Sequence, residues 1–513
     1  MVTAFSLPEA DAVILDGTRL TVDEVVRVAR YGGRAALAVH AEEAIERGHA
    51  ALEAHVASGA TIYGLTTGVG ALDGQPVSAL SSEENRAFQR NLLLSHAAGA
   101  GAPMSAERVR AMLLVRANVL ARGRSGAKLE TVRALTAMIE RGVHPYVPEI
   151  GSVGASDLAA LAHAALLLVG EGWALVDGKR VSGGVAMKRH GIALPNLSGR
   201  DAFALINGPA QTLGTGALAV HDARRLGRAS EIAAAMAMVG AKSRTDFLDE
   251  RLFEDERDPC AASARRMRDL LTSRRAPRPT SQVRESLSTR CAPMVLGAFR
   301  AAVARAEETI GFELNRVVDN PILLSDGALT NNSGLMHSAL AAESLDALAS
   351  SVIQVAQMSE RRVARLLDPA MNGGLPGFLL HPTAKPGLHS GLMIHQYTAA
   401  AIVSELRAGS APASVQSIPV GNGTEDHGSM SALAARRAAW AVSLAEIAVG
   451  IELVTAAQAV DLRRAADVDL EIPPRLDAIR RRLRRRIPIL VEDRLAAADI
   501  EAAVELLRDD GIG

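Results

Sequence analysis

The sequence predicts a mainly α-helical protein, in which a bundle of long helices follows a loop-rich N-terminal region. In three long stretches apolar residues recur every three or four positions, a spacing typical of a helix with one buried face. The stretches contain Val303, Ile310, Leu314 and Val317; Leu345, Leu348, Val352 and Val355; and Trp440, Leu444, Ile447, Ile451 and Val454. Three successive helices of this kind predict an up-down bundle.

The composition of the 513-residue chain is that of a soluble globular protein. Apolar residues make up 48%, charged residues 22%, and the net charge is −1, so no overall field favours nucleic acid or an anionic membrane. The two cysteines, Cys260 and Cys291, suit a reducing compartment, and no basic segment precedes an apolar run at the N-terminus. We expect a cytoplasmic protein without nucleic-acid or membrane partners. The arginine-rich segment 480–486 is expected to be a solvated helix face.

The first helix signal and the first loop signal both lie near the N-terminus. Thr21 precedes Val-Asp-Glu, which predicts a capped helix start. The segment TIYGLTTGVG, residues 61–70, is too rich in glycine and threonine to be the interior of a regular element. Tyr63 within it is, on local grounds, most simply a packed residue. Further on, RAFQRNLLLSHAAGA (86–100) predicts a helix that ends near His96, where an imidazole interacts favourably with the helix dipole.

The segment GSVGASDLAALAH, residues 151–163, has an unusual start. Gly151 and Gly154 allow backbone angles that a β-carbon would resist, so Ala155 and Ser156 can take an uncommon conformation. Asp157 stands where a carboxylate suits the positive end of a helix. Local pattern alone favours a capped, buried helix.

Several later segments carry polar residues that local pattern leaves open. Residues 170–184 predict a small hairpin, and Asn207 lies in an Asn-Gly pair that is often only a turn. Residues 243–283 predict a long lid-like loop, which runs into VRESLSTRCAPMV and Arg290. Glu405, in QYTAAAIVSE, reads locally as an exposed helix acid.

Together these segments resemble the aromatic amino acid ammonia-lyases, in particular the histidine type. The family versions read YGxNTGFG, LQxNLxxSHAAG, GSVGASGDLAPLAH, QDxYSxRCxPQV and ASVDSIPTSANQEDHVSM. The similarity runs from about residue 15 to the C-terminus and implies the long-helix fold of the ammonia-lyase and fumarase–aspartase type. We expect one unit over residues 1–513, with an N-terminal region (1–200), a central bundle (201–465) and a C-terminal helical segment (466–513).

The resemblance also implies a reaction and the residues that perform it. The family removes ammonia from an α-amino acid and leaves an α,β-unsaturated acid. By resemblance, Tyr63 is the base for the β-proton, His96 contacts the substrate side chain, Asn207 and Arg290 hold the substrate, and Glu405 faces it. A guanidinium suits the planar carboxylate. The resemblance further implies a homotetramer that acts on a small-molecule amino acid substrate, without a dissociable cofactor. The Glu425-Asp426-His427 run could bind a metal, but no second ligand pair is spaced for it, so we expect none.

The self-derived prosthetic group of the family is where this sequence departs from the pattern. In the family an Ala-Ser-Gly triplet cyclises to methylidene-imidazolone (MIO), and the matching residues here are Ala155, Ser156 and Asp157. The β-carbon and charge of Asp157 crowd the nitrogen that would close the ring. The family tyrosine before the arginine is Leu287 here, and a family glutamine is Thr424.

These substitutions leave two hypotheses for the function. One is an ammonia-lyase or aminomutase, with an atypical MIO group or an MIO-free elimination. The other is a non-catalytic homologue that binds an amino acid or a partner subunit. A fumarase-like elimination rests on fold analogy alone.

Overall fold

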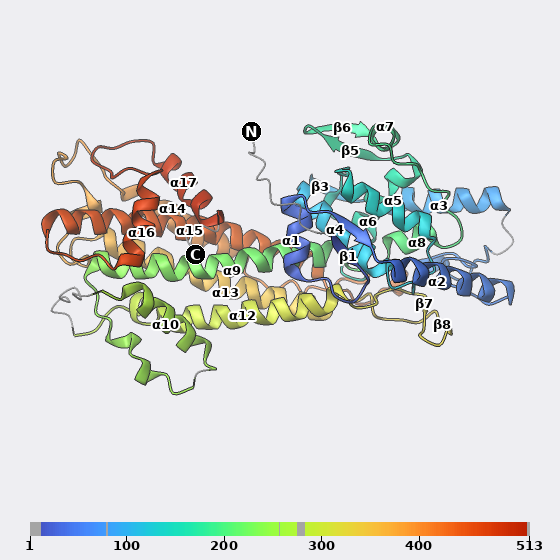
Figure 1. Ribbon diagram of the computed structural model, residues 1–513, viewed down its shortest axis with the longest axis horizontal. Coiled ribbons are helices and arrows are strands. Elements are labelled where there is room, and N and C mark those ends of the chain that lie inside the picture. The colour runs from blue at the N-terminus through green and yellow to red at the C-terminus, as the bar shows by residue number, and fades with distance from the viewer. Residues whose placement is uncertain (1–11, 78–80, 256, 274–282, 510–513) are drawn as a thin grey trace. The chain divides into compact units, whose positions relative to one another are not determined.

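The computed structural model describes residues 12–77, 81–255, 257–273 and 283–509 and is dominated by helices (Figure 1). The mainly helical fold predicted from the sequence is therefore confirmed. The α-helices are α1 (Val22–Tyr31), α2 (Val39–Ala57), α3 (Ser82–His96), α4 (Ala106–Leu120), α5 (Leu129–Glu140), α6 (Leu158–Ala165), α7 (Gly183–Arg189), α8 (Asp201–Ile206), α9 (Ala210–Ala241), α10 (Pro259–Leu271), α11 (Leu287–Arg290), α12 (Ala292–Leu314), α13 (Ala339–Leu367), α14 (Met393–Ala408), α15 (Ser431–Ala466), α16 (Pro474–Arg484) and α17 (Ala496–Arg508).

The strands among the described residues are short and form four two-stranded sheets. They are β1 (Val13–Leu15), β2 (Ala35–Leu37), β3 (Ala100–Pro103), β4 (Pro148–Ile150), β5 (Trp173–Val176), β6 (Lys179–Ser182), β7 (Ile322–Leu323) and β8 (Leu329–Thr330). The β1–β2 pair is parallel and the other three are antiparallel. The β5–β6 pair is the hairpin predicted within residues 170–184, with Trp173 opposite Ser182.

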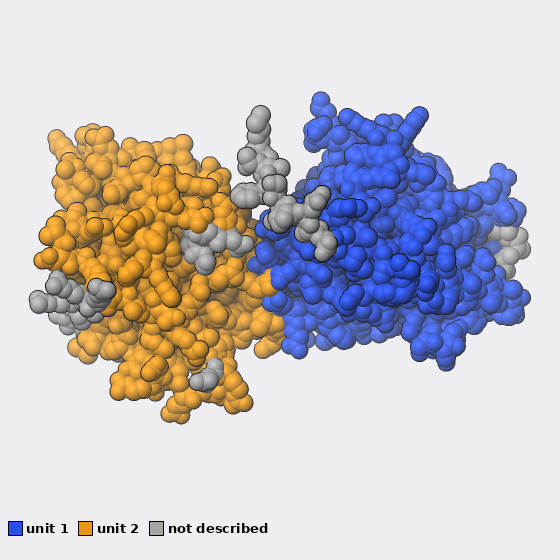
Figure 2. Space-filling view, in the orientation of Figure 1, with its two compact units in different colours: residues 1–221, 306–346, 412–436 blue, residues 222–305, 347–411, 437–513 orange. Residues whose placement is uncertain are grey.

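Contacts within the chain divide it into two compact units, shown in different colours in Figure 2. Unit 1 comprises residues 1–221, 306–346 and 412–436, and unit 2 comprises residues 222–305, 347–411 and 437–513. Within unit 1, α4 packs against α1 and α5, while α6 packs against α3 and α8. The division into residues 1–200, 201–465 and 466–513 stays a prediction.

Helix α1 begins where the sequence predicted, because Thr21 and Glu24 form a reciprocal cap. The Thr21 side chain accepts from the Glu24 backbone N–H, and the Glu24 carboxylate accepts from the Thr21 N–H at 2.9 Å. Gly32 ends the helix with φ +72°, a left-handed angle that glycine adopts without steric cost.

The predicted apolar stripes are confirmed in α13 and modified in α15. Leu345, Leu348 and Val352 are fully buried. In the first half of α15, Trp440, Leu444 and Ile447 are only half-buried, and alanines make up most of the buried face; Ile451 and Val454, further along the predicted stripe, are buried. Those alanines are Ala438, Ala441, Ala445 and Ala448. A face of small residues lets neighbouring helices approach closely, so the largest apolar side chains do not mark the core side here.

Two expectations about polar segments were wrong. The lid-like loop predicted for residues 243–283 contains α10, whose Asp258 side chain caps the Cys260 N–H at 2.8 Å; residues 256 and 274–282 lie outside the described residues. The solvated face predicted for residues 480–486 is partly buried, because Arg480 and Arg484 pair with Asp461 at 2.5 and 2.6 Å. Charge pairing across helices, which a local pattern does not reveal, buries these arginines.

Two helices, α13 and α15, are long and apolar enough to pass a length-and-composition test for a membrane span. Their most apolar windows are 56% and 72% buried inside the protein. Core helices of globular proteins pass the same test.

Candidate active site

Tyr63 is fixed in its loop through its hydroxyl, its backbone and its ring. The Gly70 N–H donates to the phenol oxygen at 2.6 Å, and the Tyr63 N–H donates to Asn331 Oδ1 at 3.0 Å. The ring meets Phe203 edge-on, with centroids 5.5 Å apart. Burial raises the pKa of Tyr63, against the lowering effect of the Gly70 hydrogen bond. The phenol is therefore oriented, and it is protonated at neutral pH.

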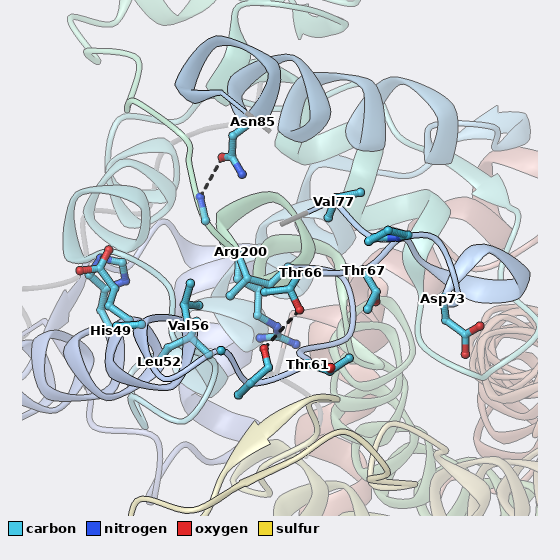
Figure 3. Close-up of a pocket in the computed structure, with 18 residues that line it drawn as sticks. His49, Leu52, Val56, Thr61, Thr66, Thr67, Asp73, Val77, Asn85 and Arg200 are labelled. Carbon is cyan, nitrogen blue, oxygen red and sulfur yellow. Dashed lines mark hydrogen bonds and ion pairs between the residues drawn. The ribbon is translucent and has the colours of Figure 1, made fainter. Parts of the chain in front are cut away.

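A pocket of about 910 Å³ lies beside the Tyr63 loop (Figure 3). Its walls come from the second half of α2, the segments 59–67 and 73–77, and the Gly199–Arg200 turn. The residues labelled in Figure 3 combine apolar Leu52, Val56 and Val77 with the hydroxyls of Thr61, Thr66 and Thr67. Tyr63 is not among the residues that line it, so this pocket adjoins the candidate site rather than containing it.

Ser156 lies at the centre of a buried hydrogen-bond network and has φ +70°. The sequence-based expectation of an uncommon backbone conformation is confirmed. Its hydroxyl donates to Asn207 Oδ1 at 2.5 Å and accepts from the Gly208 N–H at 2.9 Å. Gly154, two residues before Ser156, has φ +87°, and a β-carbon there would stand 2.3 Å from Ser429 Oγ. Glycine is thus required at position 154 by both conformation and space.

Asp157 is the fully buried residue at the N-cap position of α6, but its side chain does not cap that helix. Its backbone N–H donates to the Gly208 carbonyl at 2.9 Å. Its carboxylate accepts from the Ser152 hydroxyl at 2.6 Å and from the Thr212 N–H at 2.8 Å. Burial raises the pKa of Asp157, although these hydrogen bonds oppose the rise. The carboxylate therefore ties the 151–157 turn to the start of α9.

Asn207 is held by a charged cluster that the sequence analysis did not single out. Its Nδ2 donates to Asp319 Oδ1 at 2.7 Å and to the Asn320 carbonyl at 2.9 Å. Asp319 is fully buried and also pairs with Arg116 and Arg200 at 3.1 and 2.6 Å. This pattern fixes the amide so that its oxygen faces Ser156. The Asp-Asn-Pro run at 319–321 was the available sequence signal, although it resembles an ordinary turn.

His96 ends α3 with a defined tautomer. Its Nδ1 lies 2.9 Å from the Leu92 carbonyl, and because a carbonyl only accepts, Nδ1 carries the proton. Burial lowers the pKa of His96, against the effect of the Leu92 carbonyl. The imidazole is therefore neutral at pH 7, with Nε2 as an acceptor.

A pair of imidazoles that was not predicted from the sequence, His337 and His427, lies beside the 155–157 turn. His337 forms an isolated backbone bridge with Ala155. Its Nε2 lies 3.0 Å from Nδ1 of His427, and the two rings stack with centroids 5.2 Å apart. His427 belongs to the Glu-Asp-His run of the sequence, which was the only local signal.

The candidate residues divide between the two units. Tyr63, His96, Asn207 and the 155–157 turn belong to unit 1, where hydrogen bonds join Ser156 to Asn207. Arg290, at the end of α11, and Glu405, on α14, are exposed residues of unit 2. Leu287, where the family has tyrosine, is 62% exposed. The catalytic and substrate-binding roles of all these residues stay predictions.

Comparison with known proteins decides the family. A family profile described as aromatic amino acid lyase matches residues 20–485. A histidine ammonia-lyase from Gloeobacter violaceus is 41% identical, over 97% of this chain and 96% of that protein. The chain belongs to the aromatic amino acid lyase family. Carbon–nitrogen lyase activity and the MIO-type class are thus properties of its family.

Solved structures agree with the assignment of this chain to the aromatic amino acid lyase family. The histidine ammonia-lyase of Trypanosoma cruzi has a TM-score of 0.89 at 32% identity, covering 98% of this chain and 94% of that one. Tyrosine aminomutase from Streptomyces globisporus has a TM-score of 0.91 at 29% identity, covering 98% of both chains. Phenylalanine ammonia-lyase from a yeast, at 19% identity and a TM-score of 0.80, shares the fold.

The residues of this lyase do not fit the MIO ring of its class. Ring closure would consume the Asp157 N–H, which is committed to the buried Gly208 carbonyl. The Asp157 side chain is held as well, by the Ser152 hydroxyl and the Thr212 N–H. Among the described residues, no group of three or more His, Cys, Asp or Glu side chains could hold a metal ion.

Proposed function

We propose that this lyase eliminates ammonia from histidine or a similar aromatic α-amino acid, giving the α,β-unsaturated acid. The observation that carries the proposal is the oriented phenol of Tyr63, on a loop that resembles the base-bearing loop of the family. Histidine ammonia-lyases that are 37–41% identical over at least 96% of this chain support the substrate class.

Tyr63 acts in this proposal as the base that removes the β-proton. A phenol is a poor base while protonated, and burial raises its pKa. The Gly70 N–H, 2.6 Å from the oxygen, stabilises the phenolate when the proton is lost. The reaction therefore draws on a small phenolate population that is already oriented, and orientation is itself a large part of general-base catalysis.

The remaining roles are assigned to groups whose chemistry suits them. The neutral His96, with Nε2 as acceptor, suits the N–H of an imidazole side chain. Arg290 offers a guanidinium for the carboxylate, Asn207 contributes its amide, and Glu405 faces the substrate. We keep the MIO ring out of this proposal because Asp157 does not fit it.

The assembly and location proposed here follow the family resemblance. We propose a cytoplasmic homotetramer whose sites combine residues of more than one subunit. Arg290 and Glu405 are exposed, as residues that await a partner surface would be. Two cysteines without a disulfide suit a reducing compartment.

Two alternative functions each have a specific observation in their favour. The likeness to tyrosine aminomutase supports migration of the amine instead of its release. Leu287 and Asp157, each in place of a family functional residue, support a homologue that binds an amino acid without reacting.

The test is ammonia release from L-histidine, L-tyrosine and L-phenylalanine by the purified full-length protein. We expect ammonia and a conjugated, ultraviolet-absorbing acid in equal amounts from histidine. Tyr63→Phe should lower kcat by about 10²–10⁴-fold, the usual contribution of a general base. Tyr31→Phe, on the exposed side of α1, is the matched control and should leave kcat within about twofold.

The other outcomes would redirect the assignment. A β-amino acid without net ammonia would identify an aminomutase. Binding of histidine with neither product would identify a non-catalytic homologue.

A further inference from the structure

We infer that this lyase keeps Ala155, Ser156 and Asp157 as three ordinary residues, so that no MIO ring forms and Ser156 retains its hydroxyl. The chemical consequence, a ring-free elimination, rests on the proposed function. The structural part rests on the contacts of the 155–157 turn alone.

The chemistry of ring formation defines what the turn would have to give up. The Asp157 nitrogen would bond to the Ala155 carbonyl carbon, and that oxygen would leave as water with the hydrogens of the Asp157 and Ser156 nitrogens. A second water would take the Ser156 hydroxyl and its Cα hydrogen. The product has no N–H at position 157 and no Oγ at position 156.

Loss of the Asp157 N–H would break a buried hydrogen bond. The Asp157 N–H donates to the Gly208 carbonyl at 2.9 Å, and Asp157 is fully buried. A ring nitrogen cannot donate, so the Gly208 carbonyl would lose its partner in a place that water does not reach.

Loss of the Ser156 hydroxyl would break two more hydrogen bonds. Ser156 Oγ accepts from the Gly208 N–H at 2.9 Å and donates to Asn207 Oδ1 at 2.5 Å. Asn207 cannot turn to another partner, because Asp319 and the Asn320 carbonyl hold its Nδ2 at 2.7 and 2.9 Å. The hydroxyl is thus an integral member of a network anchored on a buried carboxylate.

The position of Asp157 also removes the freedom that cyclisation needs. In the family signature one glycine separates the serine from the aspartate that precedes the helix. Here Asp157 is itself the residue before α6, and its carbonyl accepts the Leu161 N–H at 3.1 Å. Its carboxylate is held by Ser152 and Thr212. The nitrogen therefore belongs to a residue fixed on both its backbone and its side chain.

Elimination without the ring balances with groups that the chain supplies. Tyr63, as phenolate, takes the β-proton and becomes phenol. The electrons of the broken C–H bond form the double bond, and those of the C–N bond leave with the nitrogen. A substrate that enters with an α-ammonium group thus releases neutral ammonia.

The experiment is the intact mass of the purified full-length protein, followed by peptide mapping across residues 151–163. We expect the mass computed from the sequence. A variant with one glycine inserted between Ser156 and Asp157 restores the family spacing, and we expect it to lose the mass of two waters within that peptide. Ser156→Ala in the insertion variant is the matched control and should not show the two-water deficit, since the second water takes the Ser156 hydroxyl.

One result would overturn the inference, and a second would overturn its explanation by the spacing at Asp157. A two-water deficit in the unaltered chain would show that the ring forms despite Asp157. An unmodified insertion variant would show that the spacing at Asp157 is not what prevents it. Assay of ammonia release on the same samples separates the two proposals. An unmodified, inactive protein would refute the proposed function and uphold this inference, whereas a modified, active protein would do the reverse.

Discussion

Replacing Asp319 with asparagine tests the buried charge cluster that supports the candidate site. The change conserves volume and removes one negative charge. Asp319 is fully buried between Arg116 and Arg200, each about 1% exposed. In the variant one carboxylate oxygen becomes an NH₂ group, which turns donors toward the donors of a guanidinium. We expect loss of stability without a cavity.

The magnitude follows from the geometry. Arg200 Nη2 lies 2.6 Å and Arg116 Nη2 3.1 Å from the carboxylate oxygens, so two cations depend on one anion. Breaking a buried ion pair by removing one partner costs about 3–5 kcal/mol, because a charge is left buried without compensation. We expect Asp319→Asn to lower the free energy of unfolding by that amount.

The assay is urea unfolding followed by helical circular dichroism, with Asp326→Asn as the matched control. Asp326 is exposed and accepts from the Ala328 N–H at 3.0 Å, a bond that asparagine can also accept. The control should change stability by less than about 0.5 kcal/mol. A loss below about 1 kcal/mol for Asp319→Asn would refute the claim that the two arginines depend on this carboxylate.

The pH dependence gives the same prediction a second readout. Burial by itself raises the pKa of Asp319, but Arg200 and Arg116 outweigh it and hold the pKa below its usual value. A carboxyl whose pKa is lowered on folding adds stability above its unfolded pKa of about 3.9, and that stability is lost as the pH falls through the folded value. The stability gap between the protein and its variant should therefore be constant near pH 7 and should narrow below about pH 4.

Three further predictions concern single positions. Thr21→Ala removes the side-chain cap of α1 and should cost about 1 kcal/mol in the same urea assay, whereas no change would mean that the cap is not formed in solution. Gly48→Ala would place a β-carbon 1.8 Å from the Gly123 carbonyl oxygen; because backbone cannot yield, we expect a loss of about 3 kcal/mol or more, seen as a lower melting temperature. Since burial raises the pKa of Tyr63, kcat at saturating histidine should rise with pH from 7 to at least about 10, the ordinary value for tyrosine, and a plateau near neutrality would exclude Tyr63 as the titrating base.

Local signals in the sequence predicted those features that depend on neighbouring residues. The cap at Thr21, the hairpin within 170–184 and the buried stripe of α13 are of this kind, because each is set by residues within about one or two turns of each other. Gly154 and the uncommon backbone of Ser156 also follow from a short pattern.

Features that depend on distant residues could not be predicted in this way. Asp319 acts on Asn207 across 112 positions of the sequence. Arg480 pairs with Asp461, 19 positions earlier in the sequence. This buried ion pair is the reason that the expected solvated face is partly buried. In the first half of α15 most of the buried residues are alanines, and Trp440 is only half-buried. The neighbouring helix determines which side chains fit such a close contact, and a local pattern does not reveal it.

The missing glycine before Asp157 shows how both kinds of information combine. The sequence reveals the deletion, yet a deletion alone allows two outcomes: the turn could relax until the nitrogen of Asp157 reaches the Ala155 carbonyl, or it could stay fixed. The structure distinguishes them through Gly208, which lies 52 positions beyond Ser156. Its N–H holds the Ser156 hydroxyl and its carbonyl holds the Asp157 N–H, so one residue restrains both atoms that cyclisation would have to change. Both Gly208 groups are buried, so relaxing the turn would leave the N–H and the carbonyl without hydrogen-bond partners. The turn of three ordinary residues is therefore the lower-energy outcome.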